Sequence, residues 1–191
     1  MTEEASAPIG MNDRVNRWVA ISVALVSVFL GVAKVKDDNI CQAMQEAKSR
    51  MVDTWNEYQA KKIKHHLDEA SAFQLELQLP SLPPEIRAKA SERRDLLLSH
   101  VTRYTDEEVK LRAQAEGFDK KYDDLNFVDD QFDLADAALS MSLGLLAVAA
   151  LIGSMWLLRF SWIFIAFGVL EGLSAFCGWG FHPDWLMNFL S

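Results

Sequence analysis

Three histidines are the residues whose type and spacing come nearest to a chemical site. His65 and His66 are adjacent, and His100 lies in the next charged stretch, with Glu69 and Glu92 as the acids expected beside them. Imidazoles from two helices together with a carboxylate can hold zinc or another divalent ion. The spacing matches no metal signature such as His-Glu-x-x-His. Histidines on a highly charged helix are more often solvated or hydrogen-bonded, so the sequence predicts neither a metal nor another cofactor.

Glu171 is the second candidate, because it is the one charged residue in the apolar stretch 161–181. A carboxylate in the middle of a membrane is costly and is by default a sign of function. Two interpretations stay open. In the first, a protonated Glu171 donates a hydrogen bond to a carbonyl or to Ser22, Ser27 or Ser154 in a neighbouring span. In the second, Glu171 handles protons or ions, although no second acid or base inside the membrane continues a relay.

No motif for covalent or phosphoryl chemistry accompanies these residues. The sequence has no nucleophile–base motif, no phosphate-binding glycine loop and no haem attachment signature. Its two cysteines, Cys41 and Cys177, are far apart in the chain. The net charge is −8 and no basic cluster is interleaved with aromatic residues, which argues against nucleic-acid binding. We therefore expect no catalytic residues and a protein that is not an enzyme.

Charged and apolar residues are segregated along the 191 residues. Residues 34–134 hold 16 of the 19 basic and 21 of the 27 acidic side chains. Outside them, three apolar runs cover residues 18–35, 137–160 and 161–181. A membrane-spanning helix needs about 20 largely apolar residues. The sequence therefore predicts three transmembrane helices, the first of them uncleaved because the segment before it carries acids and lacks the basic start of a signal peptide.

The charged middle predicts two long amphipathic helices. Residues 38–79 contain no glycine or proline, and apolar residues recur there at steps of three and four, the spacing of one helical face. Prolines at 80, 83 and 84 then interrupt the helix, and a second such pattern follows. Two amphipathic helices joined by a short turn are expected to pack antiparallel. The expected register pairs residue i with 163 − i, which brings Trp55 to Glu108.

The predicted fold is therefore an all-α membrane protein with three transmembrane helices and a long antiparallel, coiled-coil-like hairpin between the first two. Its predicted segments are an N-terminal tail (1–15), the first span (16–36), the hairpin (37–134, with its turn near 80–84), the second span (135–159), the third span (160–181) and an interfacial C-terminal tail (182–191).

Polar residues at seam positions of the hairpin are predicted to fix its register or to bind a partner protein. Such residues cost stability but specify pairing and oligomeric state. In the expected register the Trp55 indole donates to the Glu108 carboxylate. The residues predicted as seam or partner contacts are Trp55, Tyr58, Gln59, Lys62, His66 and Glu108.

Each span also carries small residues at helical spacing. In lipid, small side chains let helix backbones approach closely. These stripes either face one another within one chain or face a second subunit. The residues predicted to pack in this way are Ala24, Ser27, Gly31, Ser140, Gly144, Gly168 and Gly172.

Residues 55–66, with the sequence WNEYQAKKIKHH, resemble the signature of a bacterial family called domain of unknown function 4337. The segment 131–135, QFDLA, and the pair of C-terminal spans resemble the same family. The resemblance covers most of the chain from Arg14 onward. It implies a bacterial inner-membrane protein and implies no activity.

The function expected from these features is that of a scaffold or accessory protein in the bilayer, forming a homo-oligomer or joining a membrane protein complex. The alternative is a small channel or transporter component that uses Glu171. The orientation is predicted from the basic residues near the ends of the spans. Arg14, Arg17 and Arg159 lie on the N-terminal side, and Lys34 and Lys36 lie on the hairpin side. Because basic residues favour the cytoplasmic side, we expect a cytoplasmic N-terminus and a periplasmic hairpin.

Overall fold

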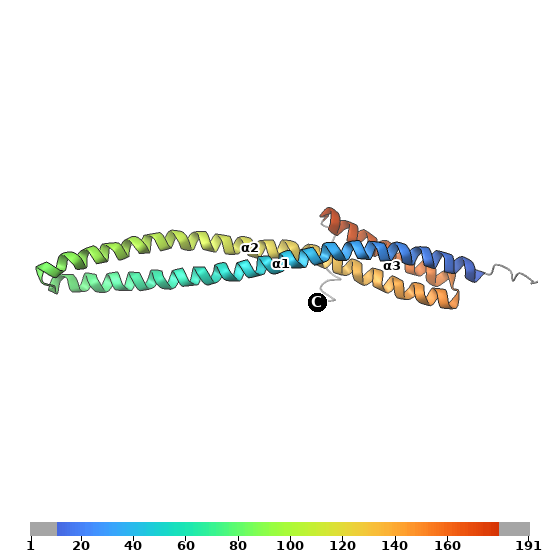
Figure 1. Ribbon diagram of the computed structural model, residues 1–191, viewed down its shortest axis with the longest axis horizontal. Coiled ribbons are helices and arrows are strands. Elements are labelled where there is room, and N and C mark those ends of the chain that lie inside the picture. Colours follow the sequence, from blue (N-terminus) through green and yellow to red (C-terminus); the bar gives the residue numbers. More distant parts are fainter. Residues whose placement is uncertain (1–10, 180–191) are drawn as a thin grey trace, which may run out of the picture. The chain divides into compact units, whose positions relative to one another are not determined.

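The computed structural model describes residues 11–179 and builds them from three α-helices and one short 3-10 helix (Figure 1). The elements are α1 (Met11–Gln78), η1 (Leu79–Ser81), α2 (Pro84–Ile152) and α3 (Met155–Cys177). Each α-helix contains a stretch long and apolar enough to cross a membrane. The predicted all-α class, with three helices long and apolar enough to cross a membrane, is confirmed.

The chain divides into two compact units. The first, called the apolar unit below, comprises Met1–Ala43 and Asp124–Ser191. The second, called the charged unit, is Met44–Asp123. Helices α1 and α2 each contribute to both units, and Figure 1 shows each of them as one unbroken ribbon.

Helix α1 begins earlier than predicted. It starts at Met11, so residues 11–15, expected as part of a tail, are helical and place Val15 in the core of the apolar unit with none of its surface exposed. The predicted C-terminal tail, residues 182–191, lies outside the described residues. Downstream, α1 continues to Gln78 because no glycine or proline interrupts it after Gly31.

Prolines define the connection between α1 and α2. Helix α1 ends at Gln78 and α2 begins at Pro84, as the predicted turn near residues 80–84 requires. The Ser81 hydroxyl donates to the Gln78 carbonyl over 2.8 Å and closes the short η1 turn. The Pro83 carbonyl then accepts from the Ile86 and Arg87 amides at 3.1 and 3.0 Å, which starts α2. Proline suits the first turn of a helix because amides there lack an intrahelical partner.

The break between the last two helices lies six residues before the predicted one. Helix α2 ends at Ile152, Gly153 has φ +69°, and Ser154 is the N-cap of α3, with its side chain accepting from the Leu157 amide. A left-handed glycine ends a helix without a Cβ penalty and serine caps the next one. The predicted boundary at Arg159 was therefore wrong, and Arg159 lies inside α3.

Helices α1, α2 and α3 share one hydrophobic cluster in the apolar unit. Val15 and Val19 come from α1, Leu146 and Ala149 from α2, and Leu158 from α3, and all five are buried. Ile165, from the predicted third span, packs against this cluster and is partly buried.

The charged unit has a thin core made largely of small side chains. Its buried hydrophobic residues are Met44, Ala47, Ala72, Leu97 and Ala115. Three of the five are alanines, which remove little apolar surface from water. Polar contacts between α1 and α2 therefore carry much of the specificity of this unit.

Those contacts follow a register different from the predicted one. The Lys48 ammonium lies 5.0 Å from the centre of the Tyr122 ring, and Lys61 pairs with Glu107. The predicted register would have placed Lys61 opposite residue 102 and Lys48 opposite residue 115, five and seven residues before their actual partners. A displacement near one heptad leaves residues of similar kind facing one another, which is why the pattern alone did not exclude it.

Candidate functional site

Glu108 does pair across the charged unit, but with a different residue than predicted. Its Oε1 atom lies 2.8 Å from His65 Nδ1, and both side chains are mostly buried. Trp55 instead packs edge-on against Tyr58, with ring centres 5.5 Å apart. The predicted bond between Trp55 and Glu108 is replaced by these two contacts.

Three of the predicted seam residues lie on the outside of α1. Gln59, Lys62 and His66 are exposed, and His66 pairs with Glu69 at 3.3 Å where both side chains are more than 60% exposed. The half-buried side of the helix carries Tyr58, Lys61, His65 and Asp68 in their place. A seam role for Gln59, Lys62 and His66 is therefore wrong, whereas their availability to a partner stays a prediction.

A layer of ion pairs forms between α1 and α2. Lys61 binds Glu107, His65 binds Glu108, and Asp68 binds His100 at 3.0 Å. The hydrogen bond from Lys61 is the main cause that lowers the pKa of Glu107, and the same bond raises the pKa of Lys61. Such pairs fix which residues face each other more than they add stability.

These ion pairs also separate the three histidines that were considered as ligands of one metal ion. His65, His66 and His100 are each bound to a different carboxylate, Glu108, Glu69 and Asp68 respectively. Within residues 11–179, no group of neighbouring metal-ligand atoms includes a histidine. The structure therefore does not bring the three imidazoles together.

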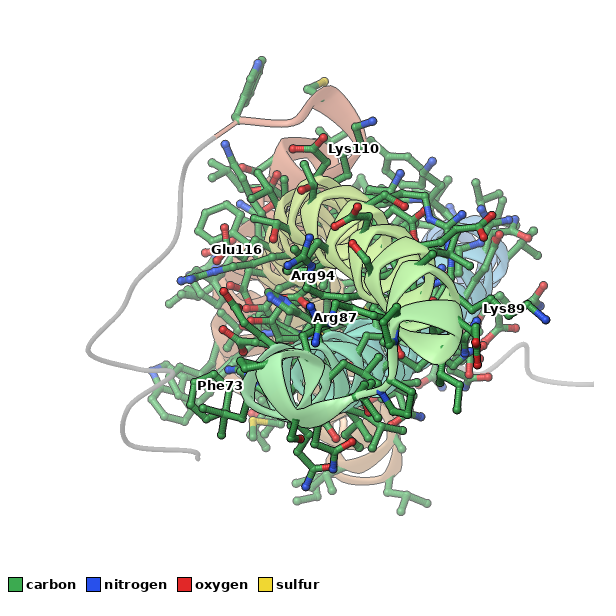
Figure 2. All side chains as sticks on the ribbon, turned by 90° about the vertical axis from the view of Figure 1, so that its left-hand side faces the viewer. Phe73, Arg87, Lys89, Arg94, Lys110 and Glu116 are labelled. Atoms are coloured by element: carbon green, nitrogen blue, oxygen red, sulfur yellow. The ribbon has the colours of Figure 1, made fainter. Side chains whose placement is uncertain are left out.

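The side of α1 that faces away from these ion pairs carries large apolar side chains beside the exposed Gln59 and His66. Five large residues of the charged unit are about half to two-thirds exposed there: Val52, Ile63, Leu67, Phe73 and Leu77. At about 100° of rotation per residue, these five positions fall within about 120° of helix surface. We call this surface the outer face of α1; Figure 2 shows Phe73 at the outside of the ribbon. The expected register, residue i with 163 − i, would have buried Phe73 against Ala90 and Leu77 against Ile86, and their exposure contradicts it.

The small residues of the spans fall into two groups. A Cβ atom added at Gly168 would lie 2.7 Å from Leu139 Cγ, and one at Gly172 would lie 2.7 Å from Phe29 Cζ, so these glycines permit close packing within the chain. A Cβ at Gly31 or Gly144 would meet no atom within 4 Å.

The remaining predicted packing residues resemble Gly31 and Gly144 in lying on the surface of the chain. Ala24, Ser27 and Ser140 are exposed. Packing within one chain therefore accounts for the stripe of α3 and leaves the stripes of α1 and α2 on the surface.

Glu171 is fully buried on the packed side of α3. Gly168, Gly172 and Ala175 are buried with it. The serines proposed as its partners have other roles: Ser22 accepts from the Trp162 indole at 3.1 Å, and Ser154 caps α3.

Sequence reasoning missed a second buried polar group near Glu171. The Gln131 amide donates to Ser174 Oγ over 3.2 Å and to the Trp179 carbonyl over 3.0 Å, and Gln131 has no exposed surface. Ser174 also donates to the Trp179 carbonyl. The signal available in the sequence was a glutamine six residues before the start of the apolar run at residue 137. These hydrogen bonds connect the C-terminal end of α3 to α2.

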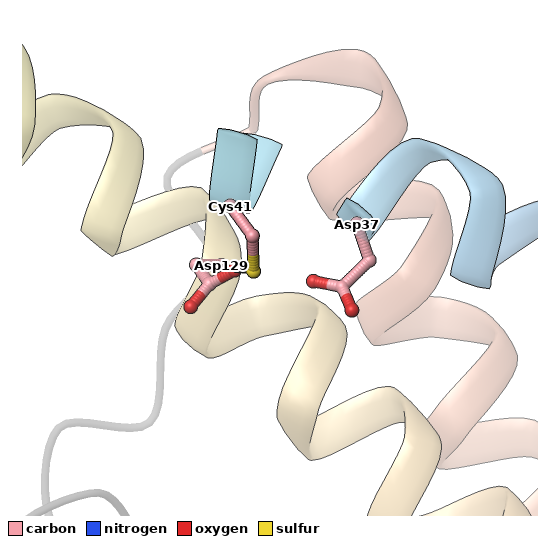
Figure 3. A group of neighbouring side chains, drawn as sticks. All are labelled: Asp37, Cys41 and Asp129. Atoms are coloured by element: carbon pink, nitrogen blue, oxygen red, sulfur yellow. Dashed lines mark hydrogen bonds between the residues drawn. The ribbon is translucent and has the colours of Figure 1, made fainter. Parts of the chain in front are cut away.

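A third polar group was also not predicted. Asp37 and Cys41 project from one side of α1 toward Asp129 of α2 (Figure 3). The Cys41 thiol donates to Asp129 Oδ1 over 3.1 Å. That hydrogen bond is the main cause that raises the pKa of Cys41 to about 11. The spacing of four residues between Asp37 and Cys41 was the available signal, since it puts both on one helical face.

Comparison with known families confirms the family resemblance that residues 55–66 and 131–135 indicated. The family model described as Domain of unknown function (DUF4337) matches residues 15–178. The searches of curated proteins and of solved structures returned no match. Because the match spans most of the sequence and all three helices, the chain belongs to the family Domain of unknown function (DUF4337).

Proposed function

We propose that this protein is a scaffold or accessory protein of the bacterial inner membrane, whose charged unit is an antiparallel helical hairpin that binds a second copy of the chain. The observation that carries the proposal is the outer face of α1. Its large apolar side chains are exposed, while the interior of the same unit is filled mainly with alanine.

The contacts between α1 and α2 support the hairpin. Along α1 the residue number rises from Lys48 through Lys61 to Asp68, while the partners on α2 fall from Tyr122 through Glu107 to His100. Two segments that pair in this order run in opposite directions. The short η1 connection is compatible with such an arrangement.

The outer face supports a protein partner. Ile63, Leu67 and Leu77 are each more than 60% exposed, and fully burying such a side chain contributes roughly 1.5–3 kcal/mol. Positions 52, 59, 63, 66, 70, 73 and 77 repeat at steps of three, four or seven, so α1 carries a second heptad-like stripe opposite the first, apolar except at Gln59 and His66. A helix with two such stripes is typical of bundles with more than two helices.

Two features favour a second copy as the partner. The charged unit holds 14 basic and 15 acidic residues, a net charge of −1, so two copies approach without strong repulsion. The open glycines Gly31 and Gly144 also leave surfaces in the membrane-spanning part where helices of another subunit can pack closely. One homo-oligomer would cover both kinds of surface.

Site-specific photo-crosslinking in mild detergent tests the proposal. A crosslinking residue at Ile63 or Phe73, on the outer face, should yield covalent dimers. The matched control is Lys64, which is also exposed but lies between the outer face and the ion pairs; it should yield none. Native mass spectrometry of the unmodified protein should show the same oligomer. A monomer at every concentration would refute self-association, and a crosslink only to a different protein would support the accessory role instead.

A second candidate function is that of a channel or transporter component, and the complete burial of Glu171 favours it. A buried carboxylate in a membrane-spanning helix is a candidate for proton or ion handling. Reconstituted protein should then show proton or ion flux that Glu171→Gln abolishes without changing the oligomer. Absence of flux in the unmodified protein would eliminate this function.

A further inference from the structure

We propose that Asp37, Cys41 and Asp129 form a binding site for a divalent cation of the zinc class. The site lies wholly within the apolar unit and does not depend on self-association. One ligand atom from each residue lies within 4.8 Å of the other two. In a tetrahedral zinc site, metal–ligand distances of about 2.0–2.3 Å separate the ligand atoms by roughly 3.3–3.8 Å, so small side-chain rotations would close the group around an ion.

The Asp37 carboxylate provides an independent indication of a ligand. Its side chain is only 8% exposed. Its Oδ2 atom accepts from the Lys34 ammonium at 2.7 Å, whereas no nitrogen, thiol or hydroxyl donor that the structure describes reaches the buried Oδ1 atom. The neighbouring Asp129 carboxyl can donate to Asp37 only when it is protonated. Figure 3 shows this carboxylate directed toward Cys41 and Asp129. A buried carboxylate oxygen without a donor is costly, and a cation placed between the three side chains would supply the missing contact.

The surrounding charge favours a cation. The Asp37 and Asp129 carboxyl groups lie side by side, and the charges of Asp130 and Asp133 act on the same group. Several acids thus lie close together with Lys34 as the nearby base. A divalent ion would offset their mutual repulsion.

The chemistry of the ligands identifies the class of ion. A thiolate with two carboxylates is a mixed soft and hard set, which suits zinc and its analogue cadmium better than magnesium or calcium. Binding breaks the S–H bond of Cys41, forms a metal–sulfur bond and releases one proton to solvent.

Cadmium titration of the full-length, reduced and chelator-treated protein in detergent tests the site. We expect one Cd²⁺ per chain and an ultraviolet thiolate-to-metal absorption. Cys177→Ser should retain this absorption, because Cys177 is exposed and outside the group, whereas Cys41→Ser should abolish it. Absence of the absorption in the unmodified protein, or its survival in Cys41→Ser, would overturn the proposal.

A second measurement needs no change at the cysteine. Zn²⁺ should slow maleimide labelling of Cys41 at least tenfold, with no effect on Cys177, and a chelator should restore the rate. Asp37→Asn should raise the Zn²⁺ concentration needed for this protection at least tenfold. Asp38→Asn is the matched control, since Asp38 is adjacent and 59% exposed. Labelling of Cys41 that Zn²⁺ does not change would refute the site even if every variant folded poorly.

Discussion

His65 Nδ1 lies 2.8 Å from Glu108 Oε1, and these two side chains are only 17% and 15% exposed. Both partners lie between α1 and α2, where a lone polar group would be poorly hydrated. The pair therefore specifies which turn of α1 lies beside which turn of α2.

Removing one partner of this pair should cost more than removing both. His65→Leu leaves the Glu108 carboxylate without its partner, and we expect a loss of about 1–3 kcal/mol in the free energy of unfolding. His65→Leu combined with Glu108→Leu should recover most of that loss, because both polar groups are then replaced. Thermal unfolding followed by circular dichroism measures each variant.

His66→Leu is the matched control for this experiment. His66 and its partner Glu69 are both more than 60% exposed, so the change should stay within about 0.5 kcal/mol. An equal loss in His65→Leu and His66→Leu would contradict the assigned register.

Acid should weaken the charged unit through Glu107. Lys61 lowers the pKa of Glu107 below its ordinary value of 4.5. A carboxyl group with a lowered folded-state pKa stabilises the protein above the unfolded-state value, and this contribution disappears as the pH falls through the lowered pKa. Glu107→Gln should therefore flatten the dependence of the melting temperature on pH below about 4.5.

The matched control for the acid prediction is Glu116→Gln. Glu116 also pairs with a base, Arg112, at 2.8 Å, but within the same helix and at 56% exposure. Its substitution should leave the acid limb of the profile unchanged. A profile that Glu107→Gln does not alter would show that the Lys61 pair does not persist in solution.

The two kinds of glycine in the spans should respond in opposite ways to a methyl group. Gly168→Ala would place a Cβ 2.7 Å from Leu139 Cγ and 3.0 Å from the Ala135 carbonyl oxygen, and we expect a loss of about 1–3 kcal/mol from overpacking. Gly144→Ala meets no atom within 4 Å, so the isolated chain should unfold at an unchanged or slightly higher temperature. If both variants are neutral, α3 does not pack on α2 through Gly168.

The outer face of α1 should control assembly. Ile63→Glu places a charge at a side chain that is 69% exposed in the single chain, so the fold should survive while the dimer weakens. We expect the dimer dissociation constant to rise at least tenfold, which corresponds to about 1.4 kcal/mol. Light scattering after gel filtration measures this change. Lys64→Glu introduces the same side chain one residue further along and should leave the dimer intact.

Some structural elements could be predicted from the sequence and others could not. The three spans and the turn at Pro80–Pro84 could be predicted, because segregated hydrophobicity and proline leave a strong local signal. The break at Gly153–Ser154 was missed because apolar residues continue on both sides of it.

The errors at the candidate sites have a different cause. The register of α1 against α2 and the meeting of Cys41 with Asp129 depend on which turns of two long helices face each other. A heptad pattern repeats every seven residues, so it leaves registers that differ by about seven residues nearly equal in energy. Individual pairs such as His65 with Glu108 decide between them, and those pairs are visible only once both helices are placed.

The orientation of the chain in the membrane gives the last prediction. Arg14, Arg17 and Arg159 lie near one side of the spans, and Lys34 and Lys36 lie near the other. The excess of basic residues favours the first side as cytoplasmic, which places the charged unit and the C-terminus in the periplasm. Alkaline phosphatase fused after Ser191 should be active, and a fluorescent cytoplasmic reporter there should be dark. The control fusion, truncated after Gly153 between α2 and α3, should give the reverse pattern, because only two spans then precede the reporter. Fluorescence at Ser191 together with phosphatase activity at Gly153 would place the charged unit in the cytoplasm.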